Sequence, residues 1–372
     1  MPESDAEVAA IVRGSAAERR RVRVAGAGHS FSPLCATDDV LISLERLTGI
    51  ESADPHWRRA TIRAGTRIRD LGAPLAAMGL ALENQGDIDV QTLAGAISTG
   101  THGTGRILGS LSTQVDGLRV VTALGETVEW SAECASELWS AARVALGALG
   151  VVTAVRLRLI EAYRLHERLW QEPVEQCLDA LEEHIASNRH FEFFWYPATD
   201  LAHMKALNPA DAQPEEVAGR SGERIDESFR VFPSVRDTPF DEMEYSVPAE
   251  AGPACFTELR QLMRMRHPHV TWPVEYRTLA PDDIDLSTAF GRATVTLSIH
   301  QDARLPYEAF FRDAEAIFQA HNGRPHWGKI HWMSAEQLAA QYAQWDNFQT
   351  VRRRQDPRGM FLNEYLRQLF ET

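Results

Sequence analysis

The sequence has little cysteine and no long apolar run. The four cysteines are Cys35, Cys134, Cys177 and Cys255. They lie far apart and form no Cys-x-x-Cys pair, which argues against a zinc site and against a disulfide framework. No metal site is therefore predicted. The longest uncharged apolar run, Val144 to Val155, is well short of the roughly 20 residues that span a bilayer. The N-terminal residues also lack the basic and apolar regions of a signal peptide.

Positive charge is scarce as well. The 372 residues include 38 Lys and Arg against 52 Asp and Glu, a formal charge of −14. Nucleic-acid binding depends on neutralising phosphates, so nucleic acid and anionic membranes are unfavourable partners. A local basic pocket for an anionic cofactor remains compatible, because net charge governs steering and solubility rather than single sites. We expect a soluble cytoplasmic protein without a transmembrane segment, with peripheral membrane contact left open.

The chain is long enough for two or three domains, and 44% of its residues are hydrophobic, as in folded proteins. Residues 1–160 contain short Val/Ile/Leu runs between glycines, which predict strands broken by helical pieces such as Ile68–Met78. A first helix is expected near the N-terminus. After Glu161 the patterns become longer and more helical, so the predicted fold class is α+β.

The second part of the chain combines helices and strands. Apolar residues at helical spacing between Val174 and Ile185 predict one helix, and the residues 191–196 that follow predict a strand. The polar stretch Pro209–Ser228 shows no periodicity and is expected to be a long exposed loop.

Further along the chain, two strands and two helices are predicted. The strands cover Trp272–Leu279 and Ala293–His300, and a helix over Tyr307–Ala320 carries a core-facing aromatic stripe. Ser334 and Gln337 fit a capping box that opens a last helix, which runs toward Arg354.

Three glycine-rich segments interrupt these patterns. Residues 24–30 contain Gly26 and Gly28 after a strand, but Phe31 replaces the third glycine of a dinucleotide-binding motif, which leaves a phosphate-binding backbone nest or an ordinary turn. In residues 86–105, glycines alternate with Ser and Thr. This segment offers more small polar surface than a purely structural loop needs. Residues 147–154 by themselves favour a plain helix-to-strand turn.

Taken together, six motifs occur in an order that resembles the aldonolactone oxidase branch of the vanillyl-alcohol-oxidase type flavoproteins. They are GAGHSFSPL, GDIDVQTLAGAISTGTHGTG, GALGVVTAVRL, EYR, RPHWGK and DPRGMFLNEYL. The branch includes gulonolactone, arabinonolactone and alditol oxidases, and the resemblance covers nearly the whole chain. It implies an FAD-binding part of the PCMH type at 1–160, an α+β cap at 161–330, and a segment at 331–372 that returns to the FAD side.

The resemblance also implies cofactor contacts. It matches FAD-binding positions to Ala25, Gly26, Ala27, Gly28, His29, Ser30, Ser98, Thr99, Gly100, Thr101, His102, Gly103, Thr104, Gly109, Ser112 and Val152. His29 matches the histidine that family members often bond covalently to the flavin 8α-methyl group, and Thr101 lies near the position linked to oxygen access. Family members usually have further residues ahead of the helix that starts near Glu7.

Two predicted strands carry three of the four candidate catalytic residues, and Lys329 is the fourth. Glu275 and Arg277 share one strand face, either as a solvated pair or as the family's Glu-x-Arg, which would bind substrate hydroxyls and stabilise the reacting oxygen or flavin carbonyl. Residues 294–300 place three hydroxyls and His300 on one face, which is either an exposed sheet face or a wet polyol cavity. His300 matches the family's active-site histidine, a candidate to relay the hydroxyl proton.

The remaining assignments come from the resemblance. Lys329 matches a positive charge near flavin N1 and substrate, and Thr104 matches a small hydroxyl residue beside both. Asp302 stands where alditol oxidases have a substrate-contacting threonine, which weakens an alditol hypothesis. The leading hypothesis is an FAD-dependent sugar-lactone oxidase that uses O2 and releases H2O2. The alternatives are an alditol oxidase, a lactone dehydrogenase with another acceptor, and a flavoprotein that binds without turnover.

Overall fold

The first part of the chain is built on a five-stranded antiparallel sheet. The computed structural model describes residues 1–234 and 238–371. The sheet has the order β3 (Ile50–Asp54), β4 (Arg59–Arg63), β8 (Val151–Arg158), β6 (Val115–Val121) and β7 (Thr127–Trp130). A parallel pair, β1 (Val22–Ala25) and β2 (Val40–Ser43), and a short antiparallel pair, β5 (Leu80–Ala81) and β9 (Ile160–Glu161), lie beside it. The Val/Ile/Leu runs predicted as strands in this part are confirmed as β1, β2, β4, β6, β7 and β8.

Short helices surround this sheet. They are α1 (Asp5–Ala17), α2 (Gly72–Ala77), α3 (Leu93–Thr99) and α4 (Ser136–Ala142), with 3-10 turns at Ile68–Asp70 and Leu111–Gln114. The expected N-terminal helix is α1, whose N-cap Ser4 accepts a hydrogen bond from the Glu7 backbone. The helical piece expected at Ile68–Met78 is a 3-10 turn followed by α2.

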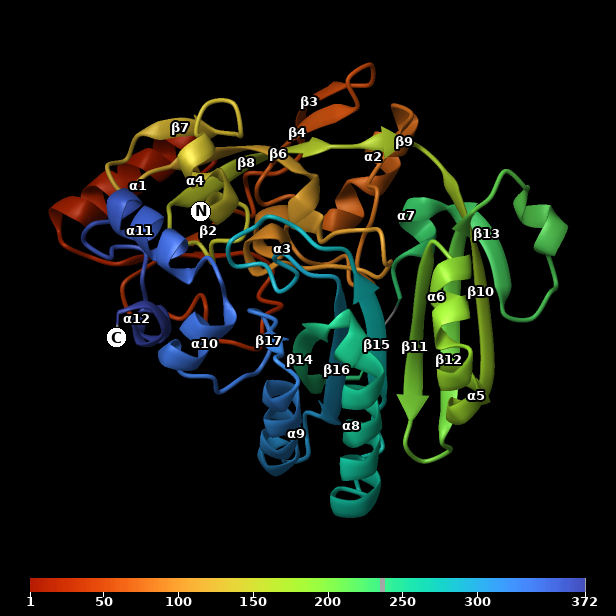
Figure 1. Cartoon of the computed structure of the whole chain (residues 1–372). Helices are drawn as coiled ribbons and strands as arrows, with labels where there is room; N and C mark the ends of the chain where they lie inside the picture. Colours follow the sequence, from red (N-terminus) through yellow and green to blue (C-terminus); the bar gives the residue numbers. More distant parts are fainter. Residues whose placement is uncertain (235–237, 372) are drawn as a thin grey trace.

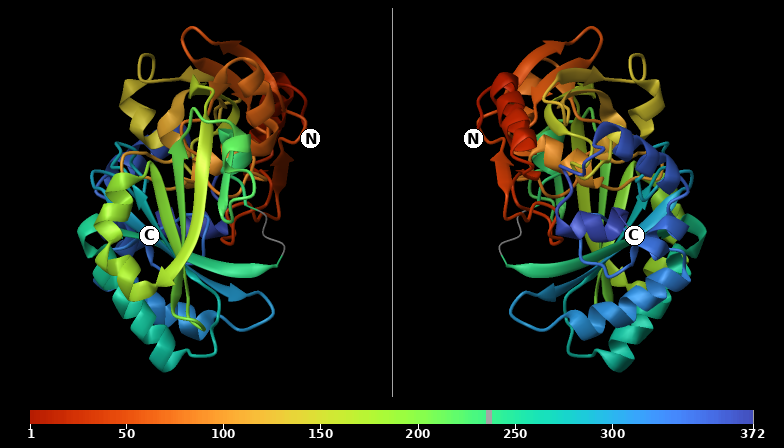
Figure 2. Two further views of the ribbon diagram at one scale, coloured as in Figure 1. Left: turned by 90° about the vertical axis from the view of Figure 1, so that its right-hand side faces the viewer. Right: turned by 90° about the vertical axis from the view of Figure 1, so that its left-hand side faces the viewer.

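The second part of the chain is an eight-stranded antiparallel sheet. Its order is β13 (Glu223–Glu227), β10 (Arg164–Pro173), β12 (Leu201–Pro209), β11 (His190–Tyr196), β15 (Val274–Leu279), β16 (Thr294–Asp302), β14 (Phe240–Pro248) and β17 (Arg324–Pro325). Figures 1 and 2 show the first part of the chain above this large sheet in all three views.

The two faces of the large sheet differ in chemistry because side chains alternate along each strand. On one face, Phe193, Tyr276, Leu297 and Tyr245 are aligned across four strands and are buried. Helices cover this face: Phe193 contacts Phe256 of α8 (Gly252–Arg266), and Tyr245 stacks on Phe318 of α9 (Glu308–Ala320). The aromatic stripe predicted for residues 307–320 is therefore part of the core.

On the other face, four residues are aligned in the same way, and three of them are polar. Phe194, Glu275, Ser298 and Glu244 are paired in register across β11, β15, β16 and β14. Because this face lies against the first part of the chain, its polar residues are also buried. Glu275 and Arg277 do share one face, as predicted, but they are not a solvated pair.

The C-terminal segment contacts the first part of the chain. It forms α10 (Ala335–Gln341), α11 (Trp345–Gln355) and α12 (Glu364–Phe370). Phe361 belongs to one buried cluster with Val8, Val12 and Val22, and the Val22 backbone donates to the Met360 carbonyl. The capping box at Ser334 is confirmed.

Three sequence predictions about elements were wrong. The helix expected over 174–185 is two helices, α5 (Val174–Asp179) and α6 (Leu181–Ser187), because the backbone at Ala180 leaves helical geometry. The helix expected from Ser334 to Arg354 ends at Gln341 and starts again at Trp345. The stretch 209–228 contains a 3-10 turn at Pro214–Val217 and edge strand β13, with α7 (Ser228–Val231) starting at its end.

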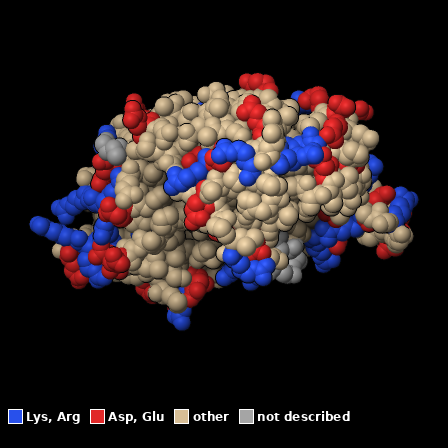
Figure 3. Space-filling view, turned by 90° about the horizontal axis from the view of Figure 1, so that it is seen from below, with Lys and Arg blue, Asp and Glu red and all other residues tan. Residues whose placement is uncertain are grey.

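The surface seen from below carries Lys and Arg intermixed with Asp and Glu among uncharged residues (Figure 3). Within the described ranges, we find no helix that combines the length and the apolar character needed to cross a membrane.

Candidate functional site

The first cavity of the candidate site is formed by small residues and backbone. It has a volume of about 230 Å³, and the predicted cofactor residues that line it are Ala25, Gly26, Ala27, Gly28, His29, Ser30, Ser98, Thr99 and Val152. A Cβ atom on Gly26 would lie 2.3 Å from Thr92 Oγ1, and Gly28 has φ +68°, so both positions favour glycine. A wall of closely approaching backbone suits a phosphate-bearing ligand such as FAD.

A buried arginine, Arg23, connects the segments that line this cavity. The Arg23 side chain donates to backbone carbonyls of Leu34 at 2.8 Å and Leu146 at 2.7 Å, and also to the Phe361 carbonyl. Burial lowers the Arg23 pKa to about 10, and the nearby Cys35 thiol partly offsets this effect. Because one side chain binds three distant loops, Arg23 fixes the positions of the walls relative to one another.

A second, smaller cavity of about 50 Å³ adjoins the first. Three of the predicted catalytic residues, Glu275, Arg277 and Lys329, line it together with Thr101 and His102. His29 and Gln91 line both cavities. The sequence motifs of the first part of the chain therefore meet the charged face of the large sheet at His29.

Arg277 is held by carboxylates on three sides. Its Nε lies 2.9 Å from Glu192 Oε2, its Nη2 lies 3.7 Å from Asp87 Oδ2, and it also bonds Glu275. Burial alone would lower the Arg277 pKa, but Glu275, Glu192 and Asp87 raise it well above its usual value. Lys205 Nζ binds the same two outer carboxylates, Asp87 at 2.9 Å and Glu192 at 3.1 Å. The guanidinium is thus fixed in position and permanently charged.

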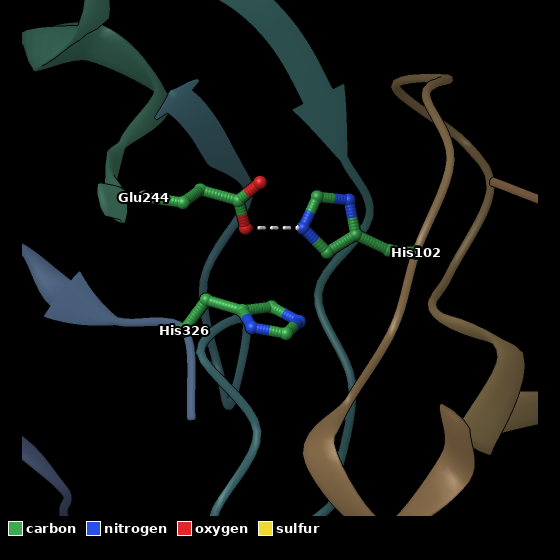
Figure 4. A group of neighbouring side chains, drawn as sticks. All are labelled: His102, Glu244 and His326. Carbon is green, nitrogen blue, oxygen red and sulfur yellow. Dashed lines mark hydrogen bonds and ion pairs between the residues drawn. The ribbon is translucent and has the colours of Figure 1, made fainter. Parts of the chain in front are cut away.

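His102 is positively charged in this structure. Its Nδ1 lies 2.9 Å from the Gly103 carbonyl and its Nε2 lies 2.9 Å from Glu244 Oε1 (Figure 4). Both acceptors lack hydrogens, so both ring nitrogens must donate. Burial alone would lower the His102 pKa, but Glu244 raises it above its usual value. In turn, His102 holds the pKa of Glu244 well below its usual range, against the effect of burial.

The third residue in Figure 4, His326, is neutral. Its Nδ1 accepts a hydrogen bond of 3.1 Å from the Gly328 backbone, so the proton of the neutral ring is on Nε2. Burial lowers the His326 pKa to about 4, in spite of Glu244. Atoms of His102, Glu244 and His326 lie within 4.8 Å of one another. Because His102 donates from both nitrogens and His326 Nδ1 already accepts, a metal ion would have to displace these hydrogen bonds.

Glu242 links Lys329 to His300. Its carboxylate lies 2.5 Å from Lys329 Nζ and 3.8 Å from His300 Nε2. Burial would raise the Glu242 pKa, but Lys329 and His300 lower it to about 2. His300 Nδ1 lies 2.9 Å from the Pro273 carbonyl, which fixes a proton on that nitrogen. His300 lines a larger outer cavity next to the cluster.

Some predicted residues have structural contacts away from these two cavities. The Thr104 hydroxyl donates to the Phe191 carbonyl at 2.6 Å and accepts from the Thr278 backbone at 3.2 Å, and Thr104 lines a small separate cavity with Gly103. Ser112 donates to the Ile97 carbonyl, and the Gly109 carbonyl accepts from Asn84. Gly100 ends α3 with φ +76°. Their assignments to cofactor or substrate stay predictions.

Sequence reasoning missed five charged residues of the cluster: Asp87, Glu192, Lys205, Glu242 and Glu244. One signal was available. The chain has only two lysines, Lys205 and Lys329, and both are in this cluster. All other Lys/Arg positions of the chain are arginine, so the two lysines mark positions where a compact ammonium group is used. The carboxylates have no such signal, since acidic residues occur throughout the chain.

The fold defines the class of protein. Cholesterol oxidase from Brevibacterium sterolicum superposes with a TM-score of 0.87 at 17% identity, over 99% of this chain and 93% of that one. Chitooligosaccharide oxidase superposes with a TM-score of 0.79 at 15% identity, over 97% and 89% of the two chains. A family model described as FAD binding domain matches residues 1–131. The chain has the two-part α+β fold of vanillyl-alcohol-oxidase type FAD enzymes.

Sequence comparison gives the family. The model described as D-arabinono-1,4-lactone oxidase matches residues 155–220 and 216–369. The chain is 37% identical to L-gulono-1,4-lactone dehydrogenase of Mycobacterium tuberculosis and 28% identical to L-gulonolactone oxidase of Bos taurus, in each case over 99% of this chain and 94% of the relative. It is 30% identical to alditol oxidase of a Streptomyces species over 93% and 89%. The chain belongs to the D-arabinono-1,4-lactone oxidase family of FAD-linked oxidoreductases.

Proposed function

We propose that this protein oxidises a CH–OH group of a sugar lactone of the D-arabinono- or L-gulono-1,4-lactone type. The observation that carries this proposal is the position of His29, which lines both the cavity of the glycine motifs and the cavity of Glu275, Arg277 and Lys329. In this proposal residues 1–160 hold FAD, residues 161–330 hold the substrate, residues 331–372 return to the FAD side, and the protein acts in the cytoplasm.

When bound, FAD supplies a hydride acceptor for a carbinol carbon. The backbone of residues 25–30 and the residues 98–104 would hold it, together with Val152, Gly109 and Ser112. His29 would bond the 8α-methyl group of the flavin, because it lies where the two cavities meet.

The charged residues would divide the remaining work. Arg277 and Lys329, each fixed by buried carboxylates, would place positive charge beside the reacting oxygen. Glu275, and Thr104 if its hydroxyl becomes available, would hydrogen-bond the other hydroxyls of the substrate. His300 Nδ1 lies within hydrogen-bond distance of the Pro273 carbonyl, and in this proposal its Nε2 would accept the hydroxyl proton. Glu242 at 3.8 Å would stabilise the resulting imidazolium.

The electron acceptor has two candidates. The leading one is O2, which gives H2O2, and the alternative is another acceptor, since relatives of this chain are named both oxidase and dehydrogenase. Oxidation of an alditol is the second substrate hypothesis. Asp302 does not support it, because this residue pairs with Arg304 near the protein surface. Peroxide release and dye reduction, measured with the same lactone, separate the two acceptors.

Anaerobic reduction of the bound flavin tests the proposal. We expect the visible flavin absorbance to bleach on addition of L-gulono- or D-arabinono-1,4-lactone, and Glu275→Gln to bleach at least about tenfold more slowly. We also expect acid-denatured protein to keep its yellow colour, and His29→Ala to release the flavin. A protein that stays colourless after refolding with FAD would contradict the function, whereas free FAD in the wild-type supernatant would contradict only the covalent bond.

A further inference from the structure

Beside the charged cluster lies an outer cavity of which the proposed reaction uses only one lining residue, His300. Its volume is about 730 Å³, against about 50 Å³ for the cavity around Glu275 and Arg277. Pockets for drug-sized ligands typically measure roughly 300–1,000 Å³. Asp87 and Phe240 line both cavities, so the outer space continues directly from the site. A single lactone ring reaching the cluster would leave most of it unfilled.

The walls of the outer cavity combine aromatic rings with polar groups. Phe194, Tyr196, Phe240 and Trp272 line it, all only partly buried. Phe240 lies 5.6 Å from Trp272 and 5.4 Å from the His300 ring, measured between ring centroids. The aromatic wall therefore starts at the candidate proton acceptor and extends outward. Ring faces of this kind bind amphipathic groups that offer C–H surface on one side and hydroxyls at the edge.

The charges around the outer cavity compensate one another. Lys205 is bound by Asp87 and Glu192, and Arg224 Nε lies 2.6 Å from Glu167 Oε2. Among the described residues, the lysine and the arginine that line the cavity are thus already bonded to carboxylates. A phosphate or carboxylate on the ligand would have to compete with these pairs, whereas neutral hydroxyls can hydrogen-bond to them without disrupting them.

We propose that this outer cavity is a subsite for a second, neutral sugar ring, so that the protein prefers lactones that carry a glycosyl group on the end far from the reacting carbon. This proposal rests on the proposed lactone oxidation and specifies a substrate with two sugar rings. The second ring lies against Trp272 and Tyr196, with its hydroxyls toward Asp87 and Glu167.

A cavity-filling variant with a matched control tests the subsite. Leu169, which is 49% exposed, lines the outer cavity, and Leu305 is equally exposed without lining it. The probes are a hexono-1,4-lactone and the same lactone glucosylated on its terminal hydroxyl. In the wild-type holoenzyme we expect the glucosylated lactone to have a KM about tenfold lower at similar kcat.

Leu169→Trp should raise the KM of the glucosylated lactone about tenfold and leave that of the single-ring lactone within about twofold, while Leu305→Trp should change neither. Equal KM values for both lactones in the wild type, or equal effects of Leu169→Trp on both, would overturn the subsite and leave lactone oxidation standing. If neither lactone bleaches the flavin, the proposed function fails as well. Reduction by the single-ring lactone alone overturns only the subsite.

Discussion

The two adjoining cavities at His29 are built in opposite ways. The first consists of backbone and small side chains, and its buried Arg23 donates to the backbone carbonyls of Leu34 and Leu146. The second consists of charged side chains that neutralise one another, with Arg277 held by Glu192 and Glu275. A backbone cradle binds through many small contacts, while a charged cluster concentrates its effect in a few groups.

Because of this difference, the two cavities should respond differently to side-chain substitution. In the charged cluster, exchanging one group should alter the chemistry strongly, because buried charges depend on fixed partners. In the backbone cavity, apart from His29 and Arg23, side-chain identity should matter little except where a glycine prevents a collision. Three predictions test this contrast.

The largest effect is expected for Arg277→Lys. Lysine keeps the charge but cannot bond Glu192, Glu275 and Asp87 with one fixed fork. Loss of a positioned electrostatic group typically costs about 10²–10³ in kcat, and we expect a decrease of that size in the flavin reduction rate. Stopped-flow absorbance measures it, with bound flavin content as the control for folding. A reduction rate within a factor of three of wild type would show that the cluster does not act through Arg277.

A smaller effect is expected for Gly26→Ala. The added Cβ would lie 2.3 Å from Thr92 Oγ1, so the loop must shift away from α3. Overpacking of this kind costs about 1–3 kcal/mol, which should lower flavin loading about tenfold or more. The ratio of flavin to protein absorbance measures loading. Gly14→Ala, where a Cβ meets nothing within 4 Å, is the matched control.

The double variant Gly26→Ala/Thr92→Ala sharpens this prediction. Removal of Thr92 Oγ1 removes the collision, so loading should recover relative to Gly26→Ala alone. Unchanged loading in the double variant would mean that Gly26 contributes through its backbone conformation instead.

The smallest effect concerns stability in acid. Burial lowers the pKa of His326 and of His331 to about 4 and that of His190 to about 3, well below the usual value near 6.5. The unfolded state therefore binds more protons below pH 6.5, so stability falls as pH decreases from about 6.5 toward 4. His102, whose pKa is raised, acts in the opposite direction, since its contribution is lost as pH rises.

We expect the urea midpoint to be lower at pH 5 than at pH 7. His326→Asn keeps an acceptor for the Gly328 backbone and should remove roughly 2 kcal/mol of the difference. Surface His56→Asn should leave the difference unchanged, because His56 is exposed. An increase in stability from pH 7 to pH 5 would contradict the assignment of neutral buried histidines.

Much of the site geometry follows from strand periodicity. Alternation along 274–279 and 294–302 correctly places Glu275 with Arg277 and Ser298 with His300. Edge strand β13 has no such pattern and was missed, because its pairing with β10 joins residues about 60 positions apart. The break at Ala180 was missed because alanine itself favours helix.

The sequence by itself indicated the family, through its ordered motifs, and correctly predicted that Glu275 shares a strand face with Arg277 and Ser298 with His300, because strand alternation depends on local spacing. Only the tertiary structure decided which charges meet. Arg277 and Glu192 are 85 residues apart, and His102 and Glu244 are 142 apart, so no local pattern encodes either pair. The physical reason is that strand order brings these side chains to one buried face, where each charge is stable only beside its partner.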